Sequence, residues 1–490
     1  MMGVILKEIF RGLCVFRKIS CIFALPKYTE MQKIVIRNFG PITNAEIELK
    51  KTVVLIGEQA TGKSTIAKLI YYFKSLKEDL FNKIYNESFN QDFEFDKAKY
   101  LVFPLRKKFY EFFGSTHHLR DFEIKYYYNV EGGVCLTLSL DSKKELYVKF
   151  SNAFIFGFSE RIEGIRNLIP DSTNNNNISA VLAHNQEKLK YADRLSKLLN
   201  DKFYCMQDDN LFIIAGRNAT VGYSESFEKQ FLLSLKNQSE ELYKKHQQTI
   251  DETLMLDFID RVISIKDTFR KFGDFDSYAH ILDDKKDELR AVTNKIYAIL
   301  KGQYRIDSQG EKLVYGSESN DYIYLSNASS GQQEVIRILQ DIFLTIAQDS
   351  NVVRIVEEPE AHLFPVAQKK VVELLVQMAN HNDNNQLIIT THSPYVLTVL
   401  NNLLFARRVV DKNGSVEEEV AKIVDKESRM KSSDFSAYVL TNDNGNVASK
   451  SLIDQATGMI MQNYLDTVSE ILANEYNALY TIHAKSFQRQ

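Results

Sequence analysis

The sequence predicts an α/β fold with a mainly parallel sheet, and three observations carry this prediction. Strand-like and helix-like segments alternate across residues 301–410, which is typical of a parallel sheet with helices on its faces. The buried strand-like run TVVLIG at 52–57 leads through a glycine-containing turn into a helical pattern with apolar residues at Ile66, Ile70 and Phe73. The composition, 44% hydrophobic and 26% charged in 490 residues, is that of a globular protein with several structural units.

The first thirty residues form a basic, partly apolar segment of their own. Charged residues interrupt every apolar stretch, so the segment has neither the apolar core of a signal peptide nor the roughly 20 apolar residues of a membrane span. Residues 1–30 are therefore a leader or an upstream mis-start, because MQKIVIRNF from Met31 reads as a natural beginning. We expect no membrane association.

The remaining elements follow in four units. Residues 31–100 carry strand-like runs that predict a β-rich edge, then the core strand and a helix over 64–80. Residues 101–300 carry strand-like runs and then mostly helical patterning, which predicts an inserted β-hairpin and helical region. Residues 301–410 return to α/β alternation, and residues 411–490 are expected to form a C-terminal helical element.

The turn after the core strand, GEQATGKS, matches G-x-x-x-x-G-K-[ST] in full and opens a helix, as a phosphate-binding P-loop must. Backbone amides and the helix N-terminus supply positive potential, Lys63 reaches the β and γ phosphates, and Ser64 ligates Mg²⁺. We therefore predict binding of ATP and Mg²⁺. The predicted nucleotide-binding residues are Gly57, Glu58, Gln59, Ala60, Thr61, Gly62, Lys63, Ser64 and Thr65.

A second stretch, RIVEEPEAHLFP at 354–365, crowds carboxylates behind a buried strand. A P-loop needs a carboxylate site at the end of a neighbouring strand to hold Mg²⁺ and to activate water. We predict that Glu357 orients the metal, where aspartate is more usual, and that Glu358 is the general base. A solvated loop after a strand is the alternative.

Two further motifs complete the set. NASSGQQE at 327–334 would by itself be a helix cap, but upstream of the acid-ended strand it resembles the signature motif of ABC-type ATPases. That resemblance implies that Ser329, Ser330, Gly331 and Gln332 serve the nucleotide bound to the other protomer. His392, in THSP after a buried strand, matches the switch histidine that contacts the γ-phosphate, although one such histidine is usually structural.

The four motifs in this order resemble those of an ABC-type ATPase head, with an N-terminal lobe at 31–100 and a C-terminal lobe at 301–410. EEPEAHLFP with THSP is similar to the soluble branch that includes the RecF, structural-maintenance-of-chromosomes (SMC) and OLD-type ATPases, and the chain closely resembles PtuA-like ATPases of Septu and retron-associated anti-phage modules. The resemblance implies a homodimer or higher oligomer closed by an ATP sandwich, with Glu360 and His362 at the inter-protomer contact.

The same resemblance implies a nucleotide-dependent switch that controls a partner nuclease. No Asp-x-Asp pair follows His392, so we expect any destructive activity to belong to that partner. The alternative is a DNA-repair or chromosome-associated ATPase that binds DNA. A transporter subunit is disfavoured because the segment between the P-loop and the signature is too long.

Three observations leave alternatives open. Arg217, in LFIIAGRNATVGYS, is either a surface arginine after a buried strand or a donor to phosphate or nucleic acid. The basic, aromatic pieces PLRKKFYEFF and IKYYYN suit either a nucleic-acid face or amphipathic core elements. A net charge of −3 leaves nucleic acid undecided, and four scattered cysteines favour a reducing cytoplasm.

Overall fold

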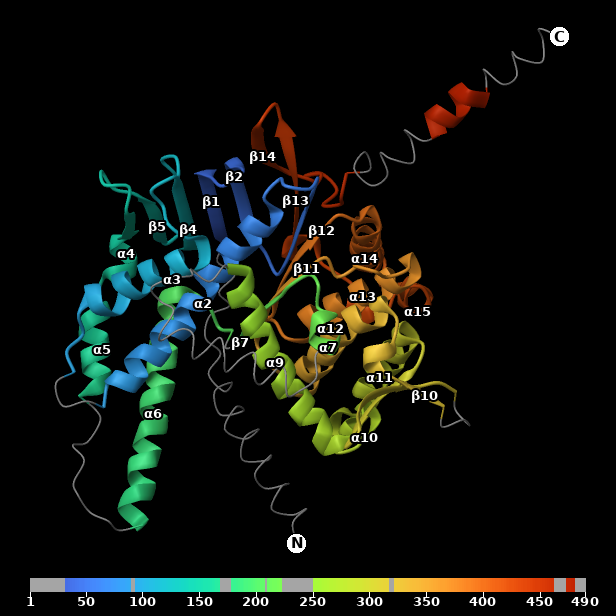
Figure 1. Ribbon diagram of the computed structural model, residues 1–490, viewed down its shortest axis with the longest axis horizontal. Coiled ribbons are helices and arrows are strands. Elements are labelled where there is room, and N and C mark those ends of the chain that lie inside the picture. Colours follow the sequence, from blue (N-terminus) through green and yellow to red (C-terminus); the bar gives the residue numbers. More distant parts are fainter. Residues whose placement is uncertain are drawn as a thin grey trace.

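The computed structural model describes residues 31–89, 93–167, 178–207, 209–222, 250–316, 321–461 and 473–480. The leader expected at residues 1–30 lies outside this part of the chain. An 11-stranded sheet forms the centre, with the strand order β6-β5-β4-β1-β2-β14-β13-β3-β12-β11-β7. Figure 1 shows this sheet at the top of the molecule, with helices below it and to one side.

One half of the sheet is parallel and buried. It consists of five strands that run parallel to one another: β7 (Asp209–Ile213), β11 (Val352–Glu357), β12 (Gln386–Thr391), β3 (Thr52–Gly57) and β13 (Phe435–Asp443). All residues of β11 and β12 are buried. Because helices cover both faces of such strands, their sequences are near-continuous apolar runs rather than alternating ones. The α/β fold predicted from the sequence is therefore confirmed.

The other half of the sheet is mostly antiparallel and forms the predicted β-rich edge. It comprises β14 (Asn446–Ser451), β2 (Ile42–Leu49), β1 (Gln32–Phe39), β4 (Glu123–Asn129), β5 (Val134–Leu140) and β6 (Leu146–Phe150). Burial alternates along β1 and β6, as expected where only one face of a sheet packs on the core. Strands β4, β5 and β6 come from the region 101–300, where an inserted β-hairpin was predicted; they pair antiparallel in succession and extend the main sheet through β4 and β1.

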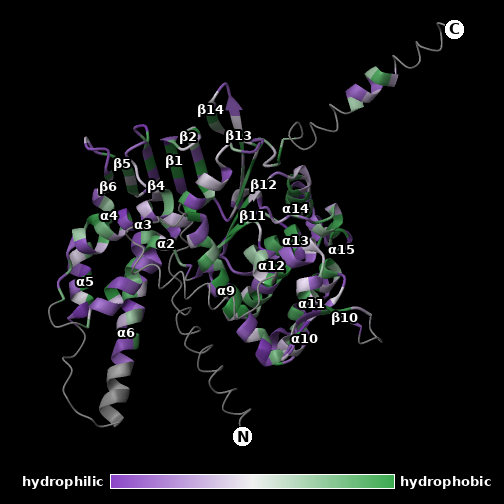
Figure 2. Cartoon of the chain, in the orientation of Figure 1, coloured by the Kyte–Doolittle hydropathy of each residue, from purple (hydrophilic) through white to green (hydrophobic). Residues whose placement is uncertain are grey.

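Helices cover the parallel half on both sides. Figure 1 shows α2 (Lys63–Glu87) and α13 (Pro365–His381) on either side of β11 and β12. Hydropathy follows this arrangement, because apolar residues concentrate along these strands and on the inner faces of the helices beside them (Figure 2). The other long helices are α3 (Phe103–Phe113), α6 (Ile178–Phe203), α9 (Ile250–Phe272), α11 (Lys286–Leu300), α12 (Ser330–Ala347) and α14 (Pro394–Lys412).

The remaining elements are short. A separate three-stranded antiparallel sheet contains β8 (Gln303–Asp307), β9 (Gly310–Val314) and β10 (Tyr322–Tyr324). The short helices are α4 (Asn152–Ile155), α5 (Phe158–Arg166), α7 (Ala219–Gly222), α10 (Phe275–Ala279) and α15 (Glu417–Ala421). No helix within the described ranges is long and apolar enough to cross a bilayer.

The structure corrects part of the helical element expected at 411–490. Residues 417–421 and 473–480 are helical, but residues 435–451 form the β13–β14 hairpin, and β13 joins the central sheet beside β3. Asn444 and Gly445 both have positive φ at the hairpin turn. An Asn-Gly pair between alternating apolar residues is a strong hairpin signal in a sequence, and NDNGN carried it here.

The basic, aromatic pieces contribute buried rings to the core, as the second of the two alternatives predicts. Phe109 and Phe112 of α3 are buried, as are Tyr126 and Tyr128 of β4. Tyr126 stacks on Phe73 of α2 with 4.7 Å between the ring centroids. Because stacking on a base needs an exposed ring face, these four rings are unavailable to nucleic acid.

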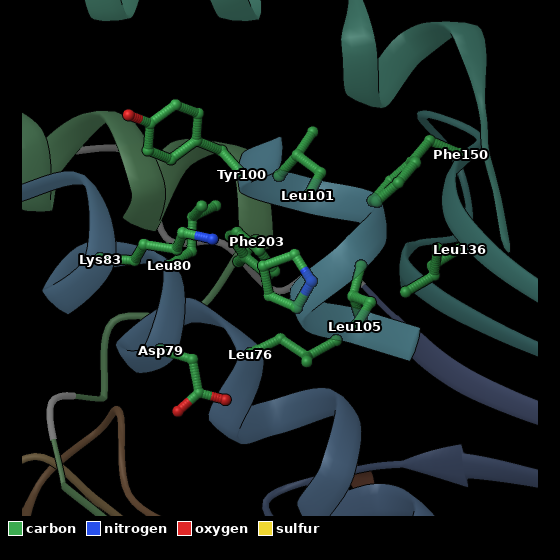
Figure 3. Close-up of a pocket in the computed structure, with 11 residues that line it drawn as sticks. Leu76, Asp79, Leu80, Lys83, Tyr100, Leu101, Leu105, Leu136, Phe150 and Phe203 are labelled. Atoms are coloured by element: carbon green, nitrogen blue, oxygen red, sulfur yellow. The ribbon is translucent and has the colours of Figure 1, made fainter. Parts of the chain in front are cut away.

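A small cavity of about 30 Å³ lies between α2, α3 and β5. Figure 3 shows its apolar lining, with Leu76 and Leu105 near its centre and Asp79 and Lys83 on one side. A space of this size holds one or two water molecules, so it is a packing defect rather than a ligand site.

Candidate active site

The P-loop connects β3 to α2 in the conformation that the motif requires. Gly62 immediately precedes α2 and has a φ of 86°, and a Cβ there would lie 2.8 Å from Ile42 Cγ1. At Gly57 a Cβ would lie 2.5 Å from the carbonyl oxygen of Leu440 in β13. The first turn of α2 contains no acidic residue. Its amides and dipole therefore present positive potential to an anion, with no acidic side chain in the same helical turn.

Lys63, the first residue of α2, folds back over this loop. Its Nζ donates to the carbonyl oxygens of Gly57 at 2.8 Å and Glu58 at 2.7 Å. Burial lowers the pKa of the Lys63 ammonium, and the charges of Glu358 and Glu360 oppose that shift. Glu358 and Glu360 belong to the turn that follows β11, residues 357–362, which we call the acidic turn. Because their charges act on Lys63, the P-loop and the acidic turn lie close together in space. Ser64 is exposed beside it.

The acidic turn begins where β11 ends. The Glu358 amide donates to Thr390 O of β12 at 2.9 Å, and Ala361 N donates back to Glu358 O at 3.0 Å. Glu358 has a φ of 42° and His362 a φ of 59°. Residues other than glycine rarely adopt this left-handed region, and it clusters at functional sites. The turn is thus held in a costly conformation by its hydrogen bonds.

The strand order differs from the sequence expectation. We predicted that the acids end a strand next to the P-loop strand, whereas β12 lies between β3 and β11. All three strands are parallel, so their carboxyl ends meet at one edge of the sheet. That edge is where ligands bind in open α/β sheets, and it gathers Lys63, Glu358 and His392.

Glu357 is suited to hold a cation. The residue is 8% exposed, Oε2 accepts a long hydrogen bond from Ala215 N at 3.4 Å, and Oε1 is buried with no hydrogen-bond partner among the residues that the structure describes. A buried carboxylate oxygen without a donor costs free energy, which a cation would offset. Within the described ranges, no three His, Cys, Asp or Glu side chains form a metal cluster. Mg²⁺ typically needs only one or two carboxylates beside nucleotide phosphates, so Glu357 and Ser64 fit it.

His392 lies next to Glu358 at the end of β12. Its Nε2 is 3.7 Å from Glu358 Oε1, and both side chains are partly exposed. Glu360 fixes the backbone here, because its Oε1 accepts from Thr391 Oγ1 at 2.6 Å and from His392 N at 3.0 Å. We predicted an inter-protomer contact for Glu360, whereas the structure gives this oxygen partners within the chain. His362 is exposed, and its inter-protomer contact stays a prediction.

The predicted signature residues lie at the start of α12, where the capping alternative is also realised. Ser329 Oγ accepts from Gln332 N, and the Gln332 side chain accepts from Ser329 N at 3.1 Å, which completes a capping box. Gln332 Nε2 also donates to Leu300 O at 2.6 Å. Ser329 and Ser330 are both exposed, although the Ser329 hydroxyl also donates to Gln332 Oε1 at 3.0 Å. The Gln332 side chain is already occupied within its own chain.

Gly331 brings the signature segment against the acidic turn of the same chain. A Cβ at Gly331 would lie 2.6 Å from the carbonyl oxygen of His362. We expect Gly331→Ala to lower the free energy of unfolding by about 1–3 kcal/mol, because the new methyl group overpacks against backbone. Thermal unfolding followed by circular dichroism measures this effect.

Gly164→Ala is the matched control, because Gly164 lies within α5 and a Cβ there meets nothing within 4 Å. This variant should be neutral or stabilising by about 0.5–1 kcal/mol, since alanine is the better helix former. Equal destabilisation in both variants would contradict a close approach at Gly331.

Arg217 is a component of the site that the sequence did not place correctly. It is fully buried, and NH1 and NH2 donate to the carbonyl oxygens of Glu357 at 2.6 Å and Glu358 at 3.0 Å. Burial lowers the pKa of the Arg217 guanidinium, while the charge of Glu334 on α12 opposes that shift most strongly. Both sequence alternatives, a surface arginine and a donor to phosphate or nucleic acid, are therefore wrong for this structure. The arginine satisfies carbonyls and a carboxylate inside the chain.

A buried stripe of charge on α12 continues this network. Glu334, Arg337 and Asp341 follow one another on one helix face and pair with Arg217, Glu311 and Arg354 respectively. Arg337 and Arg354 are both fully buried. Removing one partner of a buried pair is strongly destabilising, so α12 is tied firmly to the strands that carry the site.

The chain is similar to proteins of known family and structure. A family model described as AAA ATPase domain matches residues 30–397. No curated protein matches the chain at a significant level. Among solved structures, the SMC head domain from Thermotoga maritima is similar with 10% identity and a TM-score of 0.35, over 87% of this chain and 100% of that one. A Pyrococcus furiosus Smc head domain with an extended coiled coil, bound to the C-terminal domain of ScpA, has 12% identity and a TM-score of 0.35, over 86% and 96%.

Proposed function

The chain belongs to the AAA ATPase domain family, and from that premise we propose that it binds ATP with Mg²⁺ and hydrolyses it at the edge formed by β3, β12 and β11. The observation that carries this proposal is the meeting of three motifs at one edge. The charges of Glu358 and Glu360 act on Lys63, and Glu358 Oε1 lies 3.7 Å from His392 Nε2. Lys63 lies about 300 positions before the other three residues in the sequence.

The phosphate-binding part of the mechanism uses the P-loop. Its amides and the start of α2 receive the phosphate oxygens. Lys63 exchanges its bonds to Gly57 O and Glu58 O for bonds to the β and γ phosphates. Ser64 and Glu357 hold Mg²⁺, which neutralises phosphate charge when it is bound. The unpartnered Oε1 of Glu357 supports this assignment.

Glu358 is the general base of the proposed reaction. Its carboxylate takes a proton from a water molecule whose oxygen attacks the γ-phosphorus, and the bond between that phosphorus and the leaving ADP oxygen breaks. His392, next to Glu358, contacts the γ-phosphate and orients the water. The products are ADP and phosphate.

Magnesium removal tests this proposal directly. The purified full chain should release phosphate from ATP in the presence of MgCl₂. Excess EDTA should lower the rate by at least about 10²-fold, because several kcal/mol of transition-state charge stabilisation are lost. Added MgCl₂ should restore the rate. Phosphate release that is insensitive to EDTA would contradict the roles of Ser64 and Glu357.

We further propose that two copies of the chain close on two ATP molecules. Ser329 and Ser330 are exposed at a helix start, as a phosphate receptor for a second copy would need. Three large apolar side chains lie at the starts of α13 and α14, with exposures of 76% for Phe364, 59% for Val366 and 55% for Tyr395. Ser393 Oγ donates to Gln368 Oε1 and so joins these two helix starts. Exposed apolar groups beside a site favour a protein interface.

The physiological role that we propose is a switch in an anti-phage module, in which nucleotide state controls a partner nuclease in the cytoplasm. The support is the resemblance of the chain, over roughly residues 31–100 and 300–410, to ATPases of such modules. The alternative is a repair or chromosome-associated ATPase that binds DNA. Co-purification with the product of an adjacent nuclease gene would favour the first role. Salt-dependent DNA binding by the isolated protein would favour the second.

A further inference from the structure

Arg217 contacts both halves of the proposed site through one guanidinium group. On the acidic side, NH1 lies 2.6 Å from Glu357 O and NH2 lies 3.0 Å from Glu358 O. On the α12 side, Nε donates to Glu334 O at 3.2 Å, and the backbone N of Arg217 donates to Glu334 Oε2 at 3.1 Å. NH1 also donates to Ile214 O at 2.7 Å. A planar fork of fixed donors can make this set of bonds, whereas the point charge of a lysine cannot.

These contacts fix the backbone of the proposed base. The Glu358 amide is held by Thr390 O, and its carbonyl oxygen is held by Arg217. Glu358 itself has a φ of 42°, a conformation that persists only where the surroundings impose it. With both flanking peptide groups held, only the side-chain torsions of Glu358 remain free. The location of its carboxylate then depends on where Arg217 lies.

Arg217 in turn depends on α12. Its ion-pair partner Glu334 is 2% exposed, and the pair is separated by 3.3 Å. One helical turn earlier, Gly331 packs on His362 O at the far end of the acidic turn. The first turns of α12 are therefore linked to the acidic turn twice, directly at Gly331 and through Arg217 at Glu334, and a shift of α12 affects both links.

We propose that Arg217 is a positioning residue that couples the location of the first turns of α12 to the orientation of the Glu358 carboxylate. This inference rests on the proposed ATPase function and deepens it. It assigns Arg217 no contact with the nucleotide, because the side chain is fully buried. The predicted receptor residues Ser329 and Ser330 cap the same helix, so engagement of that helix start by a second copy would be transmitted to the base.

Arg217→Lys in the full chain tests the proposal, because it keeps the buried positive charge but loses the fork. We expect kcat to fall by about 10–100-fold, since misplacement of a catalytic group by about 1 Å has that effect. The Kd of a non-hydrolysable ATP analogue should stay within about threefold of wild type, a change of less than 1 kcal/mol. Glu334→Gln, which alters the other end of the link, should lower kcat in the same direction.

Arg429→Lys is the matched control. The Arg429 side chain is 2% exposed, and its NH1 also contacts both oxygens of a carboxylate, that of Glu417 on α15. Its Nε and NH2 donate to the carbonyl oxygen of Val424. These partners lie outside both α12 and the acidic turn. The melting temperature of Arg429→Lys should fall, as that of Arg217→Lys should, whereas its kcat should stay within about threefold of wild type.

The possible outcomes distinguish failure of the positioning role from failure of the proposed function. Wild-type turnover in Arg217→Lys would overturn the positioning role and leave the proposed function intact. Equal loss of kcat in Arg429→Lys, or a loss in Arg217→Lys that lies entirely in nucleotide binding, would overturn it as well. A wild-type chain that binds but never hydrolyses ATP would overturn both the proposed function and the positioning role that depends on it.

Discussion

Glu358→Gln should lower ATP turnover by about 10²–10⁴-fold, because the amide cannot accept the proton that a general base removes from the attacking water. The substitution keeps the size of the side chain, and the backbone contacts of residue 358 with Thr390 and Arg217 do not involve the carboxylate. ATP binding should therefore persist. Phosphate release and calorimetric titration measure the two properties separately.

The same variant should accumulate as an ATP-bound dimer, because closure on nucleotide is no longer reversed by hydrolysis. Light scattering after size-exclusion chromatography, with and without ATP, detects the change in mass. Glu418→Gln is the control, since Glu418 is exposed on α15, remote in sequence from the acidic turn. Wild-type hydrolysis by Glu358→Gln would show that another group is the base.

Lys63→Met should weaken ATP binding by about 10–100-fold, which corresponds to the loss of hydrogen bonds to a charged group. It should also lower kcat by about 10²–10³-fold, as expected when one preorganised donor to the developing charge is removed. The methionine keeps the length of the side chain and removes its charge. Nucleotide titration and steady-state kinetics separate the two effects.

Lys68→Met is the control for this substitution. Lys68 lies on the same helix, α2, and its side chain is 14% exposed, but its ion-pair partner is Asp251 on α9. This variant should bind and hydrolyse ATP as wild type does. If Lys63→Met bound ATP normally, the P-loop assignment itself would be contradicted.

Local sequence signals predicted the elements around the site well. The run QLIITT is strand β12, and Pro365 and Pro394 begin α13 and α14. A buried parallel strand is a short continuous apolar run, and proline in the first helical turn lacks only a donor that would be unpaired anyway. The glycines of the P-loop were predictable as well. Gly57 and Gly62 have positive φ and lie where nearby atoms leave no room for a side chain.

What the sequence did not predict depends on contacts between distant segments. The order of the strands, with β12 between β3 and β11, is decided by how whole helices pack on the sheet. The burial of Arg217 depends on three glutamates that lie more than a hundred residues away along the chain. The sequence alone shows an arginine after a strand, whether that arginine is exposed or buried. The one hint in the sequence was that several acidic residues follow one another at the end of β11, where a nearby cation would balance their charge.

The pairing of β13 with β3 has a consequence for synthesis of the protein. The P-loop strand is made early, yet one of its neighbours spans residues 386–391 and the other residues 435–443. Gly57 itself aligns with Leu440. Contacts of such sequence separation form late, since the intervening chain must first be ordered. As domains fold while the ribosome extends them, the nascent chain carries a P-loop that stays unsupported on both sides for more than three hundred residues. The nucleotide site is therefore completed only when almost the whole chain has emerged.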